Sequence, residues 1–180
     1  MSDQIRVGLV GYGYASKTFH APLISGTPGM ALAVVSSSDA SKVHADWPAV
    51  QVVSDPTALF TNPDIDLIVI PTPNDTHFPL AKAALEAGKN VVVDKPFTVT
   101  LSQARELDTL AKQQGKLLSV FHNRRWDSDF LTVKALINEG KLGDIAHFES
   151  HFDRYRPQVR ARWREQAGLD SGIWYDLGPH

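Results

Sequence analysis

Lys95 is a charged residue at a position where the surrounding sequence predicts burial. It follows the valine run Asn90-Val91-Val92-Val93, and its neighbours are Asp94 and Pro96. A solvated surface lysine is a poor explanation for an ammonium group at this point, whereas a half-buried lysine can hold a positive charge beside a developing alkoxide. Lys95 is therefore the first candidate for a group that stabilises negative charge during a reaction.

A glycine-containing turn provides a candidate site for phosphate groups. The segment Gly11-Tyr12-Gly13-Tyr14-Ala15-Ser16 follows a strand pattern and opens a helix pattern. Backbone N–H groups at such a helix start can bind the pyrophosphate of a dinucleotide; Gly11 permits the tight turn and Gly13 the close approach of phosphate. Ser16 replaces the third glycine of the dinucleotide-binding pattern, which weakens the match. The alternative is an ordinary strand-to-helix turn.

A serine run suggests which dinucleotide the turn would bind. Ser36, Ser37 and Ser38 end the second strand pattern, and Asp39 follows them. An acid in this region binds the ribose of NAD and repels a 2′-phosphate, whereas small hydroxyl donors with Lys42 nearby suit the phosphate. We therefore expect NADP(H), with NAD kept open by Asp39. The alternative is a serine-rich turn whose hydroxyls cap the next helix.

A proline-containing segment comes at the end of the third strand pattern. Its sequence is Pro71-Thr72-Pro73-Asn74-Asp75-Thr76-His77. Open α/β sheets bind ligands at the carboxyl ends of their strands, so this segment and the one around Lys95 should share one edge. Asn74 or Asp75 could instead simply cap a helix that begins at His77.

Alternating strand and helix patterns position these segments. Strand patterns cover residues 5–10, 31–35, 65–70, 90–93 and 116–121, and helix patterns cover residues 19–25, 55–60, 77–87 and 101–114. Strands that alternate with helices predict the α/β class, with a doubly wound parallel sheet of the Rossmann type. We expect residues 1–122 to form this dinucleotide-binding domain.

The pattern changes after residue 122. Residues 130–139 predict an amphipathic helix, and residues 145–155 alternate like a strand with one wet face. We interpret residues 123–180 as the start of a second, α+β domain. Because one strand and one helix cannot bury a second sheet, we expect the chain to be a fragment of a longer protein.

Composition excludes several classes of function. The 180 residues are 43% hydrophobic and 21% charged, with a formal net charge of −2 and no cysteine. Such a charge attracts neither nucleic acid nor anionic lipid, and the lack of cysteine excludes disulfides, thiol nucleophiles and cysteine metal sites. No apolar run approaches the roughly 20 residues of a membrane span. We expect a cytoplasmic protein without a metal site, a nucleic-acid partner or a membrane partner.

Taken together, these motifs resemble the Gfo/Idh/MocA oxidoreductases, a family that includes glucose-fructose oxidoreductase and inositol dehydrogenase. The resemblance covers the whole chain. Besides the glycine turn and residues 72–77, it rests on Asp94-Lys95-Pro96, where most members have Glu-Lys-Pro, and on Asp176-Leu177-Gly178-Pro179-His180, which matches D-x-G-x-H. Residues 121–127 and 154–165 are similar to the subgroup that includes NADP-dependent scyllo-inositol dehydrogenases.

The resemblance implies hydride transfer between a nicotinamide and a hydroxyl or keto carbon of a sugar, polyol or cyclitol such as scyllo-inositol. His180 would accept the hydroxyl proton, Lys95 would stabilise the alkoxide, and Asp176 would orient a substrate hydroxyl. If Pro179 begins a helix, Asp176 and His180 can face one cavity. The alternative role for Asp176 is that of an acid at a helix N-terminus. The family also suggests a cis peptide before Pro96.

The resemblance and the motifs together give a full set of expected cofactor ligands, with Asn123, Trp163 and Arg164 near the nicotinamide half. For Trp163, packing between domains is an alternative. The expected ligands are Gly11, Tyr12, Gly13, Tyr14, Ala15, Ser36, Ser37, Ser38, Pro71, Thr72, Asn74, His77, Asp94, Lys95, Asn123, Trp163 and Arg164.

Two other functions of the same fold remain open. One is a regulatory protein that binds a dinucleotide without catalysis, although such proteins tend to lose the catalytic lysine or histidine, and both are present here. The other is glycoside cleavage assisted by a redox step. We further expect a small-molecule substrate and a homo-oligomer formed through the C-terminal sheet.

Overall fold

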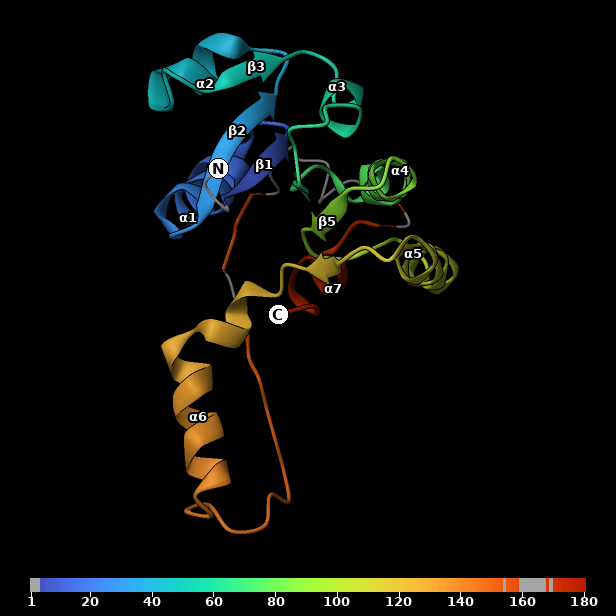
Figure 1. Ribbon diagram of the computed structural model, residues 1–180. Helices are drawn as coiled ribbons and strands as arrows, with labels where there is room; N and C mark the ends of the chain where they lie inside the picture. Colours follow the sequence, from blue (N-terminus) through green and yellow to red (C-terminus); the bar gives the residue numbers. More distant parts are fainter. Residues whose placement is uncertain (1–3, 154, 159–167, 169) are drawn as a thin grey trace. The chain divides into compact units, whose positions relative to one another are not determined.

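The computed structural model describes residues 4–153, 155–158, 168 and 170–180. These residues fall into two compact units, of which the first ends at Phe121 and the second begins at His122. Figure 1 shows the helices and strands of both units.

The first unit is built on one parallel sheet of six strands in the order β3-β2-β1-β4-β5-β6. The order reverses between β1 and β4, which is where doubly wound sheets form their ligand crevice. The sheet confirms the predicted α/β class and Rossmann-type topology. Its strands are β1 (Ile5–Val10), β2 (Met30–Ser36), β3 (Gln51–Val53), β4 (Leu67–Ile70), β5 (Asn90–Val93) and β6 (Leu118–Val120).

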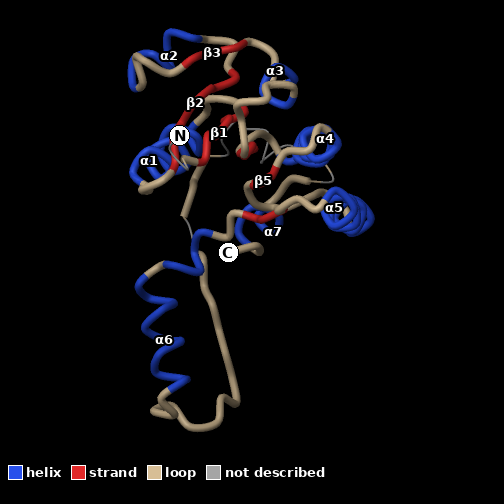
Figure 2. Tube along the Cα trace, in the orientation of Figure 1, coloured by secondary structure: helices blue, strands red, loops and turns tan. Residues whose placement is uncertain are grey.

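Helices connect the strands and cover the sheet (Figure 2). One hydrophobic cluster packs α3, α4 and α5 against the sheet, and the other packs α1 and α2 against it. The connecting elements are the π-helical turn η1 (Ser16–His20), α1 (Ala21–Gly26), α2 (Ala40–Asp46), α3 (Thr57–Phe60), α4 (Asn74–Glu86) and α5 (Leu101–Gln114).

Side-chain alternation in β4 explains why the sheet is covered on both faces. Ile68 and Ile70 belong to the cluster of α4 and α5, whereas Val69 between them belongs to the cluster of α1 and α2. Successive side chains of a strand point to opposite faces, so a strand buried on both sides reads as a continuous apolar run. Apolar runs of this kind predicted both β4 and β5 from the sequence.

Most element boundaries agree with the sequence to within a few residues. The helix at 101–114 is confirmed: Thr100 forms a capping box with Gln103 at its start, and Gly115 ends it with a φ of +60°. The first helical segment starts earlier than predicted, because η1 begins at Ser16. The short strand β3 was not predicted, since three residues give too little alternation to recognise.

The second unit contains a 3-10 turn η2 (Asn123–Trp126) and the helices α6 (Ser128–Asn138) and α7 (Ile173–Leu177). Helix α6 confirms the helix predicted at 130–139. The strand predicted at 145–155 is wrong for its described residues, which adopt no strand. A strand exists only when its backbone groups pair with a neighbour, and alternation in the sequence does not provide one.

Candidate functional site: the carboxyl edge of the parallel sheet

The glycine turn is held at the end of β1 by backbone bonds and by close packing. Gly11 has a φ of +81°, a conformation that side chains rarely adopt, and its N–H donates to the Ser36 carbonyl over 2.8 Å. A Cβ on Gly11 would lie 3.5 Å from the Thr72 methyl group, so the turn lies against the end of β4. A Cβ on Gly13 would meet nothing within 4 Å. This open space at a helix start fits a phosphate group.

Ser16 closes the turn that precedes it. Its side chain is fully buried, and its hydroxyl donates to the Gly11 carbonyl over 2.9 Å. The Lys17 amide donates to the Gly13 carbonyl over 3.0 Å. A serine therefore fits at the third position of the glycine pattern, because its small side chain is used within the turn.

Tyr12 ties the turn to α2. Its hydroxyl donates to Asp46 over 2.9 Å, and the Lys17 ammonium pairs with the same carboxylate at 2.8 Å. Burial and the Asp46 charge raise the pKa of Tyr12 to about 12, while the bond from Lys17 is the main cause that lowers the pKa of Asp46. Tyr14 is exposed and meets Phe19 edge-on, and Ala15 is half-buried.

At the end of β2, the serines occupy three different environments. Ser36 is buried, Ser38 is exposed, and the half-buried Ser37 hydroxyl bonds to the backbone of Asp39 at 3.1 Å. Asp39 itself caps α2: it accepts from the amides of Ser41 and Lys42, which corrects the alternative that serine hydroxyls cap this helix. The Ser41 hydroxyl is the main cause that lowers the pKa of Asp39.

At the end of β4, Pro71 and Thr72 are half-buried and Asn74 is buried at the first position of α4. Helix α4 begins three residues before His77, and no side chain caps it, so the capping interpretation of Asn74 and Asp75 is wrong. His77 is fully buried. Its Nε2 lies 2.8 Å from the Thr72 carbonyl and its Nδ1 lies 2.8 Å from the Pro96 carbonyl.

At the end of β5, Asp94 and Lys95 are half-buried, and the peptide bond between Lys95 and Pro96 is cis, which confirms the prediction. One Asp94 oxygen accepts from the Lys95 amide over 2.7 Å, and the other lies 3.2 Å from His20 Nε2. Burial opposes ionisation of Asp94, but the His20 bond and its charge outweigh it, so the pKa of Asp94 is lowered.

His20 is a residue that the sequence analysis missed. It belongs to η1, is buried, and packs its ring on Phe121 with 4.3 Å between ring centroids. No motif marks it, and 74 residues separate it from Asp94. Its signal is only a histidine within the first helical turns after the glycines, on the side that faces the sheet.

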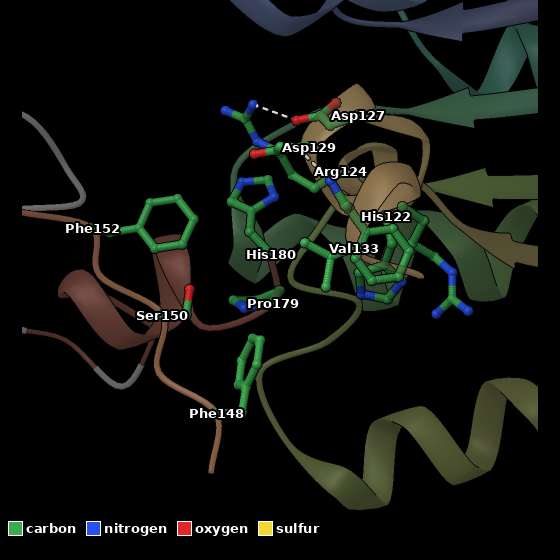
Figure 3. Close-up of a pocket in the computed structure, with 12 residues that line it drawn as sticks. His122, Arg124, Asp127, Asp129, Val133, Phe148, Ser150, Phe152, Pro179 and His180 are labelled. Carbon is green, nitrogen blue, oxygen red and sulfur yellow. Dashed lines mark hydrogen bonds and ion pairs between the residues drawn. The ribbon is translucent and has the colours of Figure 1, made fainter. Parts of the chain in front are cut away.

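The second unit forms a cavity of about 460 Å³ that includes His180. Figure 3 shows the side chains of Arg124, Asp127, Asp129 and His180 around it. Arg124 pairs with Asp127 at 2.8 Å. The lining residues are His122, Arg124, Arg125, Asp127, Asp129, Phe130, Val133, Phe148, Ser150, Phe152, Pro179 and His180.

The second unit contains two further predicted site residues, Asn123 and Asp176. Asn123 begins η2, and Asp176 lies in α7, which ends before Pro179. The expectation that Pro179 begins a helix stays a prediction, because only His180 follows it in the sequence. A Cβ on Gly178 would lie 2.5 Å from the Trp174 carbonyl, so this position of the D-x-G-x-H motif requires glycine. Trp163 and Arg164 lie outside the described residues.

The described residues contain neither a metal-binding cluster nor a helix that could span a membrane. No group of three or more histidine, aspartate or glutamate side chains in this part of the chain could hold a metal ion. Within the same residues, every helix is too short or too polar to cross a membrane.

Comparisons with known proteins place the chain among oxidoreductases. Residues 5–122 match the model of an oxidoreductase family with an NAD-binding Rossmann fold, and residues 130–180 match the Gfo/Idh/MocA C-terminal domain. The YPO2259 protein of Yersinia pestis has a similar structure, with a TM-score of 0.93 and 74% identity; the match covers 100% of this chain and 51% of that one.

Two curated relatives give the same assignment. The chain is 79% identical to "Uncharacterized oxidoreductase YdgJ" of Escherichia coli, over 100% of this chain and 52% of the relative. It is 42% identical to the scyllo-inositol 2-dehydrogenase (NADP(+)) IolW of Bacillus subtilis, over 99% of this chain and 50% of the relative. The chain thus spans about half the length of these relatives. On these matches, the chain belongs to the Gfo/Idh/MocA family of oxidoreductases.

Proposed function

We propose that this chain is the cofactor-binding part of an NADP(H)-dependent dehydrogenase or reductase that acts on a hydroxyl or keto carbon of a sugar, polyol or cyclitol. One observation carries the proposal: the open glycine turn after β1 and the Lys95 segment after β5 lie at the same carboxyl edge of the sheet, on the two sides of β4. A phosphate-binding turn would hold the dinucleotide at this edge, and a cation beside it would stabilise the alkoxide from which hydride is transferred.

Each candidate residue has a defined task in this proposal. The backbone N–H groups after Gly11 bind the pyrophosphate, and the space beside Gly13 lets it approach. The Lys95 ammonium stabilises the alkoxide, and the His180 ring accepts the hydroxyl proton. When bound, the nicotinamide supplies or takes up the hydride. Asp176 orients a second hydroxyl of the substrate.

The state of Asp39 supports the preference for NADP(H). Its carboxylate is engaged by the amides that begin α2 and by Lys42, 3.6 Å away. It is therefore less available to bind the ribose hydroxyls than a free acid would be. Exposed Ser38 offers a hydroxyl donor at this end of β2, and the Lys42 ammonium, although it pairs with Asp39, adds a positive charge near the position of a 2′-phosphate.

The names of two relatives support the substrate class. One relative is named as a scyllo-inositol 2-dehydrogenase and another, at 30% identity, as an inositol 2-dehydrogenase. Both names describe a cyclic polyol that loses hydride from a ring carbon. A homo-oligomer and a cytoplasmic location stay predictions of the sequence.

A direct test uses the full-length gene product. Fluorescence titration should show NADPH binding about tenfold tighter than NADH, a free-energy difference of about 1.4 kcal/mol. A screen of polyols and cyclitols should then show NADP-dependent oxidation of at least one cyclitol. Equal or tighter binding of NADH would contradict the cofactor preference, and a screen without turnover on any hydroxyl or keto substrate would contradict the enzyme assignment.

A further inference from the structure

We propose that two buried histidines, His20 and His77, are positioning residues that brace the Asp94-Lys95-Pro96 segment from both sides and so set the direction of the Lys95 side chain. The inference rests on the proposed function, because it gives Lys95 the reacting oxygen to face. His77 was expected among the cofactor ligands, but it is fully buried and both of its ring nitrogens face carbonyl groups of the chain, so the proposal gives it a positioning role in place of a cofactor contact.

His77 contacts the segment at Pro96. Its ring lies between the Thr72 carbonyl at the end of β4 and the Pro96 carbonyl after β5, at 2.8 Å from each. Carbonyl oxygens only accept, so each bond needs an N–H on the ring nitrogen that faces the carbonyl. The His77 side chain thus connects the segment after β4 to the segment after β5. Its contact in the second segment is Pro96, the residue that follows Lys95.

His20 contacts the segment at Asp94. Its Nε2 lies 3.2 Å from one Asp94 oxygen, and the other Asp94 oxygen accepts from the Lys95 amide over 2.7 Å. The ring is itself fixed, because its side chain is only 4% exposed and packs on Phe121. The Asp94 carboxylate therefore links the His20 ring of η1 to the backbone amide of Lys95.

The segment needs such support because it leaves the sheet at this point. The Asp94 amide still donates to the Ile70 carbonyl of β4 over 3.0 Å. Beyond that bond, the Asp94 and His77 side chains hold the backbone on either side of Lys95. A displacement of about 1 Å in a catalytic group can cost as much as a hundredfold in rate, so a brace here acts on turnover rather than on cofactor affinity.

Paired substitutions separate positioning from mere packing. An Asn amide nitrogen superposes on His Nδ1 and a Gln amide nitrogen on His Nε2. His77→Asn can therefore keep the bond to Pro96, whereas His77→Gln keeps only the bond to Thr72. Likewise, His20→Gln can keep the bond to Asp94 and His20→Leu cannot. Exposed His44, whose Nε2 lies 3.2 Å from the Val50 carbonyl, provides the control His44→Gln.

The experiment measures kcat with saturating cofactor and substrate, together with the Kd of NADPH, in the full-length gene product. We expect His20→Leu and His77→Gln to lose about tenfold in kcat, as for one lost bond, while the Kd changes less than twofold. The kcat of the other three variants should stay within about threefold of the wild-type value. These variants are His20→Gln, His77→Asn and His44→Gln. A structural role alone would lower the two His77 variants equally, and that result overturns the proposal.

Two further measurements complete the test. Lys95→Ala is assayed in parallel: if it keeps its turnover, the proposed function fails; if it loses turnover while His20→Leu and His77→Gln keep theirs, only the brace fails. Should those variants not fold, NMR of the 15N-labelled wild-type protein replaces them. Slowly exchanging ring N–H signals from both histidines support the brace, and ring protons that exchange freely with solvent overturn it.

Discussion

The two units of this chain hold their candidate groups in opposite ways. At the sheet edge of the first unit, Ser16 and His77 are fully buried, and each bonds to the backbone of a neighbouring segment. Among the described residues of the second unit, none is buried, and Phe130 and Leu131 of α6 are 45% and 42% exposed.

This difference shows which functional groups are positioned by the packing of the chain itself. A group whose neighbours are core residues has one low-energy place, because protein interiors are close-packed. The turn after β1 and the segment after β5 meet this condition. His180 lies in a cavity whose lining includes exposed side chains of α6, such as Phe130, so its position depends less on a core.

The largest expected effect is on folding stability. Leu107 of α5 is fully buried, so Leu107→Ala should lower the free energy of unfolding by about 2–5 kcal/mol. Leu131→Ala on α6 removes the same atoms from an exposed position and should cost about 0.5 kcal/mol or less. Urea unfolding followed by circular dichroism measures both. Equal losses in the two variants would remove the contrast between the units.

The next largest effect is on turnover. Lys95→Ala should lower kcat by about a hundredfold or more, since it removes an electrostatic stabiliser of the alkoxide, while the Kd of NADPH changes far less. Lys134→Ala, at an exposed position of α6, is the matched control. Steady-state kinetics and fluorescence titration give the two quantities. A Lys95→Ala variant that kept most of its turnover would show that the sheet edge lacks the catalytic cation.

A smaller effect concerns cofactor choice at the end of β2. Ser37→Asp places a carboxylate beside the adenosine ribose and should shift the NADPH-to-NADH preference by about tenfold towards NADH. Ser38→Arg adds a positive charge and should shift it the other way. Competitive titration of both dinucleotides measures the ratio. If both variants bind the dinucleotides with unchanged selectivity, the serines do not lie at the ribose.

The smallest effect is a titration within the turn. In the folded state the pKa of Tyr12 is raised from its ordinary 10.0 to about 12, so the folded protein keeps the phenol proton to higher pH than the unfolded chain does. Its contribution to stability is complete below pH 10 and is lost as the pH rises towards 12. Asp46→Asn should bring the pKa nearer 10, as read from tyrosinate absorbance with Tyr12→Phe to assign the signal. An unchanged pKa would mean that Asp46 does not hold the turn.

The same contrast explains what the sequence could predict. The buried strands at 67–70 and 90–93 were found because both of their faces are covered, which leaves an unbroken apolar run. The helix that ends at Gly115 was found because its caps are local. Both signals lie within a few consecutive residues, and so do the glycine turn and the Lys95 segment.

The parts that could not be predicted depend on distant partners. The pairing of His20 with Asp94 joins residues that no local pattern connects, because it is created when η1 packs on the sheet edge. The strand predicted at 145–155 is wrong for its described residues for the same reason, since alternation indicates a strand only where another strand is available to pair with it. Residues of one motif can be read from sequence, whereas the groups that hold them cannot.

The central claim is that the carboxyl edge of the first unit's sheet binds a dinucleotide through the turn after β1. Titration of the 15N-labelled chain with NADPH tests it most directly, because each residue other than proline has its own backbone amide signal. We predict that the amides of Gly11, Gly13 and Ser37 shift together in a saturable manner, and that the amides of α6 stay in place. Shifts confined to α6 and the His180 cavity, or no saturable shift at the glycine turn, would contradict the claim.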